Sequence, residues 1–352
     1  MLERDVWNSA IPAPDGAAEG AARARWDTLA KPLGSLGLLE EAVTRVCAAQ
    51  GTPSPELRPR TVLVFCADNG VTEAGVAGTP PSITAVMAGI IRDKRSAVGL
   101  MADCAGAEVL AVDMGMFTRV PGLTDRRIAP GTKNFVREPA MTREQAVRAL
   151  EAGRALALER AKRGDRLLLT GEMGIGNTTT ATAVAAALLA REPEALVGPG
   201  VGLDEAGLAR KRAAVRRGLA LHRPDPSDPL DVLSKVGGFD IAAMAGAFIG
   251  GAESRVPVVA DGFISGVAAL VAARLCPAAR PYMLASHLSM EPAAGPVLFE
   301  LGLRPILHAG MRLGEGTGAV ALLPLLDMAK AVFDGLLTYR DIGMEGGTPC
   351  NT

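Results

Sequence analysis

One stretch of this chain, residues 166–190, limits the folds open to it more than any other. Its first five residues, Arg166–Thr170, place three consecutive leucines between polar flanks, which is typical of a short strand buried on both faces. Gly171–Thr180 follows as a turn of glycines and small polar residues, and the alanine- and leucine-rich run from Ala181 predicts a helix. A strand, a glycine turn and a helix in this order indicate an α/β protein.

The glycine turn is also typical of an anion-binding site. Backbone N–H groups around Gly174 and Gly176, and the positive end of the next helix, would face a negatively charged ligand. Asn177 or Thr178 is expected to cap that helix. The spacing matches neither the P-loop nor the dinucleotide fingerprint, so glycine content alone leaves an ordinary tight turn as an equal alternative. Glu172 favours a functional site, because an acid between a buried strand and an anion cradle is costly without a role.

Strand and helix patterns alternate along much of the chain. Five segments have the composition of buried strands: Thr61–Ala67, Glu108–Val112, Arg166–Thr170, Val258–Ala260 and Tyr282–Ala285. This alternation predicts an α/β fold with a Rossmann-like, doubly wound and mainly parallel sheet and right-handed crossovers. Ligands of such sheets bind at the carboxyl ends of the strands, where most of the polar motifs lie.

Both ends of the chain have a helical character. Residues up to about Pro59 form a helical lead-in that closes with a proline-rich connector. Ala319–Asp334 predicts a helix with a bend near Pro324. Between them, Thr142 and Gln145 have the spacing of a capping box for a helix that begins at residue 143.

Charge and hydropathy exclude two classes of partner. The net charge is −1 and no block of basic residues occurs, which argues against a nucleic-acid surface. The longest apolar runs are much shorter than a membrane span. The polar start Leu2–Asp5 does not resemble a signal peptide. We therefore expect a soluble, cytoplasmic protein with neither nucleic-acid nor membrane partners.

Cysteine and histidine positions give no sign of a metal site. The five cysteines have no paired spacing, and four of them lie in apolar surroundings, which predicts buried thiols in a reducing compartment. The three histidines are scattered without the spacing of metal ligands, and they are His222, His287 and His308. No metal is expected.

A second glycine-rich segment, Leu307–Gly318, carries one carboxylate. Glycines at alternate positions leave Glu315 on an exposed loop at the start of a helix. Its carboxylate can complement the helix dipole, which is worth a few tenths to about 1 kcal/mol. It can equally serve as a general base that substrate approaches closely. The spacing leaves both roles open.

Five segments carry a resemblance to a known family, and they are Lys31–Leu36, Gly171–Thr179, Lys235–Asp240, Asp261–Phe263 and Arg312–Gly318. Together they resemble nicotinate-nucleotide–dimethylbenzimidazole phosphoribosyltransferase, which makes the lower-ligand nucleotide of cobalamin. The resemblance runs in order through nearly the whole chain. It implies a large Rossmann-like domain, expected over residues 60–303. It also implies a small helical domain built from residues 1–59 plus 304–352, and a homodimer.

The resemblance also implies a reaction. The 5-phosphoribosyl group of nicotinate mononucleotide passes to 5,6-dimethylbenzimidazole with inversion at C1′, giving α-ribazole 5′-phosphate and nicotinate. The pyridinium leaving group is already cationic, so the reaction needs no general acid, and no cofactor is expected. Glu315 is implied as the base that takes the ring proton. Glu172 is implied as an active-site acid that supports the ribose or an oxocarbenium-like charge.

Ten further residues are implied as substrate contacts. The 5′-phosphate would bind to Gly174, Gly176, Asn177, Thr178, Gly200 and Lys211, although Lys211 could equally lie on a solvated helix face. The remaining contacts are Ser289, Gly78, Val86 and Leu313. Val86 aligns with a family glutamine, Gly78 lies near a family serine, and Asn69 replaces a histidine. Another benzimidazole, a purine or a phenol therefore stays open as the acceptor.

Two other classes of function stay open. A phosphoribosyltransferase that uses phosphoribosyl pyrophosphate would carry two acids before a Thr-Gly phosphate loop, whereas leucines precede Thr170 and Gly171 here. A non-catalytic nucleotide-binding protein is the second class. The setting of Glu315 argues against it, and only an activity measurement decides.

Overall fold

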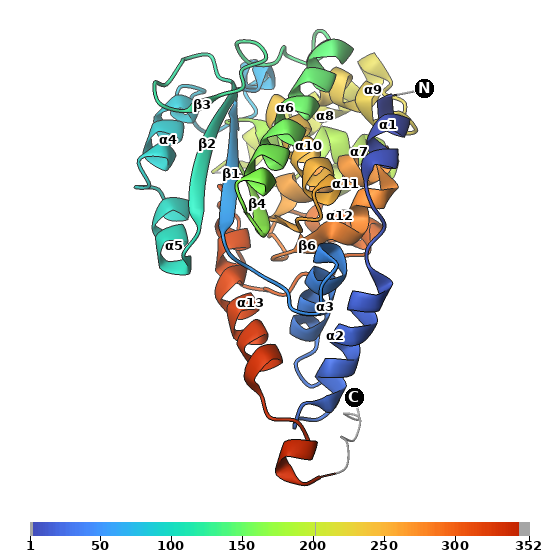
Figure 1. Ribbon diagram of the computed structural model, residues 1–352. Helices are drawn as coiled ribbons and strands as arrows, with labels where there is room; N and C mark the ends of the chain where they lie inside the picture. The colour runs from blue at the N-terminus through green and yellow to red at the C-terminus, as the bar shows by residue number, and fades with distance from the viewer. Residues whose placement is uncertain (1–2, 201, 345–352) are drawn as a thin grey trace.

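The computed structural model describes residues 3–200 and 202–344 (Figure 1). Within these residues, six parallel strands form one sheet in the order β3-β2-β1-β4-β5-β6. The strands are β1 (Arg60–Ala67), β2 (Glu108–Gly115), β3 (Thr124–Asp125), β4 (Leu167–Met173), β5 (Val258–Ala260) and β6 (Met283–Ala285). This is the strand order of doubly wound, Rossmann-type sheets. The predicted fold class and all five predicted strands are confirmed, and only the two-residue β3 was missed.

The sheet has its topological switch point between β1 and β4. The chain runs from β1 outward to β2 and β3 and then returns to place β4 on the other side of β1. Phe65 of β1 lies between Val112 of β2 and Glu172 of β4 in register. Ligands of such sheets bind in the crevice at this point, beyond the carboxyl ends of the strands. Glu172 therefore lies where the topology predicts a site.

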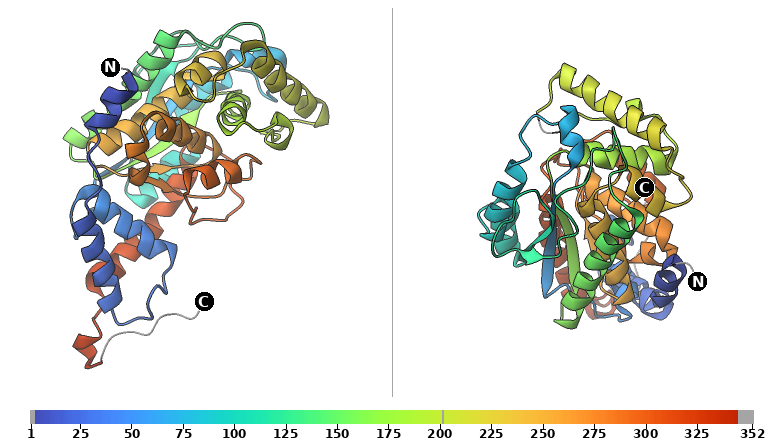
Figure 2. Two further views of the ribbon diagram at one scale, coloured as in Figure 1. Left: turned by 90° about the vertical axis from the view of Figure 1, so that its right-hand side faces the viewer. Right: turned by 90° about the horizontal axis from the view of Figure 1, so that it is seen from above.

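Helices cover both faces of the sheet (Figures 1 and 2). One face carries α4 (Ile83–Arg92), α5 (Ala97–Ala105) and α13 (Thr317–Gly335). The other carries α6 (Arg143–Lys162), α7 (Asn177–Leu189), α10 (Phe239–Glu253) and α11 (Phe263–Leu275). Because both faces are covered, the strands are apolar without alternation, and every residue of β1 is buried.

Six further helices complete the described fold. They are α1 (Glu3–Ala10), α2 (Gly16–Thr28), α3 (Leu38–Gln50), α8 (Glu205–His222), α9 (Pro229–Val236) and α12 (Ala294–Leu301). Four single 3₁₀ segments accompany them, at Gly70–Ala74, Pro193–Ala195, Pro277–Tyr282 and Arg340–Ile342. None of the described helices is both long enough and apolar enough to cross a membrane.

The two ends of the chain meet in one helical cluster (Figure 2). Helices α2 and α3 pack against the distal half of α13, with Trp26 and Phe333 in ring contact at 4.9 Å between centroids. Arg25 donates hydrogen bonds to the backbone carbonyls of Phe333 and Asp334, at 2.7 and 2.8 Å. Helix α13 continues through Pro324. The division into domains at residues 60–303 stays a prediction.

Two local predictions need comment. The capping box of Thr142 and Gln145 is present at the start of α6, as expected. Helix α7, however, begins at Asn177 rather than Ala181, and its N-cap is Gly176, with φ +91°. Neither Asn177 nor Thr178 therefore caps it, and that prediction is wrong.

The cysteines also differ in part from expectation. Cys47, Cys66 and Cys276 are buried free thiols, and burial raises the pKa of each. Cys104 is exposed, so the expectation of four buried thiols is wrong for it. Cys350 lies outside the described residues.

Candidate active site

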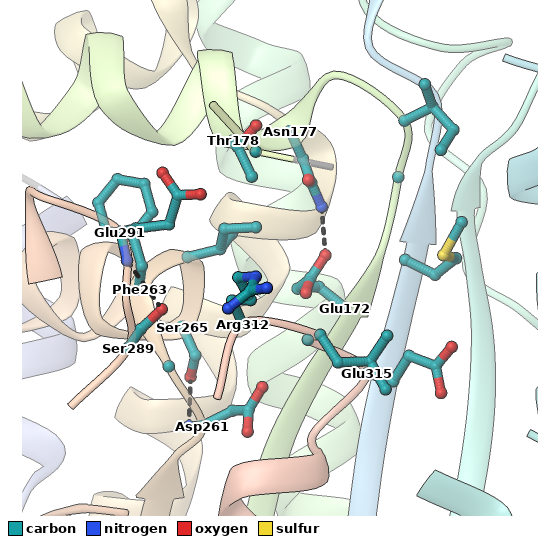
Figure 3. Close-up of a pocket in the computed structure, with 18 of the residues that line it drawn as sticks. Glu172, Asn177, Thr178, Asp261, Phe263, Ser265, Ser289, Glu291, Arg312 and Glu315 are labelled. Carbon is teal, nitrogen blue, oxygen red and sulfur yellow. Dashed lines mark hydrogen bonds between the residues drawn. The ribbon is translucent and has the colours of Figure 1, made fainter. Parts of the chain in front are cut away.

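A cavity of about 260 Å³ opens at the carboxyl ends of the strands around the switch point (Figure 3). Four segments that follow strands or precede α13 line it, together with one face of α4. The lining includes Glu172–Ile175, Asn177 and Thr178 after β4, and Asp261–Ser265 after β5. It also includes His287, Ser289 and Glu291 after β6, Arg312–Glu315 before α13, and Thr79, Ile83 and Met87 around α4. Residues far apart in the sequence thus meet at the predicted edge of the sheet.

Glu172 lies at the end of β4 and is almost fully buried. The side-chain amide of Asn177 donates to its carboxylate and also to Asp240 Oδ2, the latter at 3.2 Å. The backbone N–H of Glu315 donates to it as well. Burial, and then the neighbouring charge of Asp240, raise the pKa of Glu172 to about 8. At neutral pH Glu172 is therefore mainly a neutral acid.

Glu315 precedes α13 and has a left-handed backbone, with φ +61°. The residue is 5% exposed, so the expectation of an exposed loop is wrong. The loop lies directly on β4, because a Cβ atom at Gly171 would overlap the carbonyl oxygen of Glu315. The carboxylate accepts a hydrogen bond from the N–H of Val98, in the first turn of α5, at 3.4 Å. Burial raises the pKa of Glu315, which brings it nearer to the value that suits a general base at neutral pH.

Beside this cavity lies the region where the anion cradle was predicted. Gly78, Gly174, Gly176, Asn177, Thr178 and Gly200 line a smaller recess of about 60 Å³. Lys211 of α8 is 0% exposed, and its ammonium donates to Thr178 Oγ1 and to the carbonyl of Gly198, both at 2.9 Å. The alternative of a solvated helix face is therefore wrong for Lys211. Burial lowers its pKa to about 8, so the amine is mostly charged at neutral pH.

A cation, a hydroxyl and a helix start thus converge on this recess. Gly200 lies close above them, since a Cβ atom there would be 3.0 Å from Thr178 Oγ1 and 3.3 Å from Lys211 Nζ. In the first turn of α7, the N–H groups of Asn177 and Thr179 donate to the carbonyls of Gly174 and Gly176, at 3.1 and 3.0 Å, and the N–H of Thr178 lies between them. Together these groups suit a phosphate.

On the opposite side of the cavity, two of the expected substrate contacts, Val86 of α4 and Gly78 before it, do not line the main cavity. Val86 is 54% exposed and lines neither cavity. Gly78 lines only the small recess, whereas the adjacent Thr79 and Met87 line the main cavity. Successive residues of a helix point about 100° apart, so a shift of one position changes the face. Ser289 and Leu313, the other two expected contacts, line the main cavity.

Three buried side chains complete the site and were not assigned functional roles from the sequence. Asp240 is fully buried next to Asn177, and burial raises its pKa to about 6. Asp261 accepts hydrogen bonds from three backbone N–H groups at the start of α13. His287 lies 4.0 Å from Asp261, and burial lowers its pKa, which favours the neutral ring at neutral pH. The segments that contain both aspartates did contribute to the family resemblance, and this was the available signal.

In residues 3–200 and 202–344, no three His, Cys, Asp or Glu side chains are grouped so that they could hold a metal ion. The expectation that the reaction uses no metal or cofactor stays a prediction.

Comparison with known proteins decides the family. A family model described as phosphoribosyltransferase matches residues 11–344. The nicotinate-nucleotide–dimethylbenzimidazole phosphoribosyltransferase of Roseiflexus sp. (strain RS-1) is 46% identical over 335 residues, which cover 94% of this chain and 95% of that protein. The protein of the same name from Chloroflexus aggregans is 46% identical over 334 residues, with the same coverage. This chain belongs to the nicotinate-nucleotide–dimethylbenzimidazole phosphoribosyltransferase family.

Solved structures of this family share the fold. The crystal structure of CobT from Thermus thermophilus matches with a TM-score of 0.89 and 43% identity, over 94% of this chain and 99% of that one. A second structure, named nicotinate-nucleotide–dimethylbenzimidazole phosphoribosyltransferase from the same organism, matches with a TM-score of 0.88 and 42% identity, over 95% and 100%. The resemblance found from the sequence motifs is thereby confirmed.

Proposed function

We propose that this chain transfers the 5-phosphoribosyl group of nicotinate mononucleotide to 5,6-dimethylbenzimidazole or a related lower-ligand base. The products are α-ribazole 5′-phosphate and nicotinate. One observation carries the proposal: a single cavity is lined by Glu315 at one side and, at another, by Thr178, which is held by the buried Lys211. One cavity thus contains both a general base that can deprotonate the acceptor and groups that can bind the phosphate of the donor. The names of the relatives support the same reaction.

In this reaction the cradle fixes the donor. The 5′-phosphate accepts hydrogen bonds from Lys211, from Thr178 and from the first turn of α7, which places the ribose toward Glu172. The pyridinium cation and the positive charge that develops on the ribose favour ionised Glu172, since a nearby cation lowers a carboxyl pKa. The carboxylate then stabilises the charge at C1′ as the bond to the pyridinium nitrogen breaks.

The acceptor base lies on the α4 side of the cavity. Ile83 and Met87 supply an apolar wall there, and Thr79 supplies a hydroxyl. Glu315 takes the proton from one ring nitrogen while the other nitrogen attacks C1′. The electron pair of the breaking bond stays on the nicotinate nitrogen and neutralises the pyridinium. Attack from the face opposite the leaving group inverts the configuration at C1′.

Several alternatives are less well supported. A purine or a phenol stays the alternative acceptor, because the residues of the base pocket set its fit. Family membership and the near-complete coverage of the relatives do not favour a phosphoribosyl pyrophosphate substrate or a purely nucleotide-binding role.

We further propose a cytoplasmic homodimer that does not bind nucleic acid. The net charge of −1 supports the last point. Three apolar side chains beside the cavity, Val86, Met290 and Leu313, are more than half exposed, as expected of a face covered by a second copy. Sedimentation at the mass of one chain would contradict the dimer.

The direct test follows nicotinate release from nicotinate mononucleotide in the presence of dimethylbenzimidazole. Glu315→Gln keeps the size of the side chain but cannot accept the ring proton, so kcat should fall by about 10²–10⁴-fold. The KM for the mononucleotide should change little, because the phosphate binds elsewhere. Glu159→Gln is the matched control. Glu159 is an exposed carboxylate that forms an ion pair with Arg126, so this variant should keep wild-type kcat. A folded Glu315→Gln enzyme with near-normal turnover would refute the base assignment.

A further inference from the structure

The loop that carries Glu315 has an unusual backbone. Three consecutive residues, Gly314, Glu315 and Gly316, have φ values of +90°, +61° and +94°. A left-handed conformation is unfavourable for a residue with a side chain, and Glu315 is one of the few such residues in the described chain. Such a conformation persists only where the surrounding structure enforces it. Some group must therefore hold this loop in place.

Asp261, directly after β5, contacts the loop through its carboxylate. Oδ1 accepts the N–H groups of Gly318 at 2.6 Å and Ala319 at 3.0 Å, and Oδ2 accepts the N–H of Gly316 at 3.3 Å. Helix α13 has a glycine at its N-cap, which offers no side chain of its own for this purpose. The cap of α13 is thus supplied by Asp261, which follows β5 and lies 55 residues before Gly316 in the sequence.

Asp261 is itself held from several sides (Figure 3). The residue is 4% exposed. Its N–H donates to Ser265 Oγ at 3.1 Å, and its carbonyl accepts the hydroxyl of Ser286. Ser265 lies in α11 and Ser286 follows β6, so the aspartate is fixed to rigid elements. A fixed carboxylate that binds three N–H groups leaves the loop little freedom.

The orientation of Glu315 depends on this loop. Its carboxylate is turned away from Glu172 in Figure 3, and it reaches the N–H of Val98 at the start of α5. The backbone N–H of the same residue donates to Glu172. A rotation of the backbone at residue 315 would therefore disturb both carboxylates of the site.

We propose that Asp261 is the positioning residue for Glu315, because its hydrogen bonds to Gly316, Gly318 and Ala319 fix the left-handed backbone that sets the direction of the Glu315 carboxylate at the cavity. Asp261 acts through the backbone of the loop and takes no proton from the substrate. The inference rests on the proposed role of Glu315 as the general base.

The first test measures the loop itself. Asp261→Asn replaces one acceptor oxygen with an amide that cannot accept an N–H, so amide hydrogen exchange across residues 314–319 should accelerate at least tenfold. Unchanged exchange would overturn the proposal, whatever the chemical role of Glu315. This readout is therefore independent of the proposed function. Should Asp261→Asn not fold, Asp261→Ser keeps one hydroxyl acceptor on a shorter side chain, and it should accelerate exchange across the same residues at least as much.

The second test measures catalysis in a double-mutant cycle. Misplacement of a reacting group by about 1 Å can cost about 10²-fold, so Asp261→Asn should lower kcat by up to about 10²-fold with little change in the KM for the mononucleotide. If Asp261 acts through Glu315, the double variant Asp261→Asn/Glu315→Gln should be no slower than Glu315→Gln alone, within about threefold. Losses that multiply would mean that Asp261 acts on the substrate directly, which overturns the proposal. If Glu315→Gln alone were fully active, the base role would fail, and hydrogen exchange would still decide whether Asp261 holds the loop.

A matched control separates positioning from the general loss of a helix cap. Asp15 caps α2 by accepting the N–H groups of Ala17 and Ala18, both at 2.9 Å, in the terminal helices. Asp15→Ala removes this cap, so it should lower the melting temperature and leave kcat unchanged in both the wild-type and the Glu315→Gln background. A drop in kcat equal to that of Asp261→Asn would show that any lost cap slows the enzyme, and it would overturn the specific role of Asp261.

Discussion

Replacing Lys211 with methionine should have two opposed effects, a loss of nucleotide affinity and a gain in the stability of the free enzyme. Burial lowers the pKa of Lys211 from 10.5 to about 8. A pKa difference costs 1.36 kcal/mol per unit, so the buried charge destabilises the folded state by about 3 kcal/mol at pH 7. This cost is absent above pH 10.5, grows as the pH falls toward 8, and is constant below. The pH profile of stability should therefore flatten in the variant.

Part of this gain is lost again. Methionine leaves the carbonyl of Gly198 without its present donor, which costs about 1–2 kcal/mol. We therefore expect Lys211→Met to be more stable than the wild type by about 1–2 kcal/mol at pH 7 in urea unfolding. Lys162→Met, at an exposed position at the end of α6, is the matched control and should leave stability unchanged.

The same substitution should weaken binding of the mononucleotide. A hydrogen bond between charged partners contributes about 1.5–3 kcal/mol, so the KM should rise about 10- to 150-fold. Because only the charged amine attracts the phosphate, the wild-type KM should rise about tenfold per pH unit above pH 8, until it reaches the value of the variant. The KM of Lys211→Met should be flat over this range. Initial rates of nicotinate release from about pH 7 to 10 give both curves. A wild-type KM that is constant over this range, or a variant with wild-type KM, would refute the reasoning.

Two further predictions concern the metal and the glycine turn. The rate should be unchanged in EDTA, because the pyridinium is already cationic and leaves without a Lewis acid; a rate that collapses in EDTA and returns with Mg²⁺ would contradict this. Gly176→Val should raise the KM for the mononucleotide by about tenfold or more, since residue 176 has φ +91° and a Cβ atom there would be 2.8 Å from Thr72 Cγ2. An unchanged KM in a folded variant, as judged by circular dichroism, would remove the turn from the phosphate site.

The fold was largely predictable, because its strands are buried on both faces and so appear as continuous apolar runs. Thr61–Ala67 and Arg166–Thr170 needed no partner information to be recognised as strands. Strand β3 was missed, because a two-residue strand has no periodicity to detect. The capping box at Thr142 was predictable for a related reason, since both of its partners lie within one helical turn.

The site was less predictable wherever a side chain is directed by a distant part of the chain. Asn177 was expected to cap its own helix, but its amide is used by Glu172 and Asp240. Glu315 was expected to be exposed, because nothing in its glycine-rich segment shows that the loop packs on β4. Similarly, the face of α4 that meets the cavity is set by packing, and Met87 rather than Val86 lines it. Of the five segments that carry the family resemblance, Gly171–Thr179, Asp261–Phe263 and Arg312–Gly318 contribute to the cavity lining, and only the structure shows which of their residues face it.

Helix α13 has a consequence for anyone who modifies this enzyme. Glu315 lies just before its first turn, and its last turns are clamped by Trp26 and the neighbouring helices. With 19 residues at 1.5 Å each, it is a rod about 28 Å long. A fused tag or a poorly packed substitution near Phe333 would displace the C-terminal end of α13. Because the helix is rigid, this displacement would also change the position of Glu315 at its other end. Substitutions in the terminal helices can therefore slow turnover although these residues do not contact the substrate.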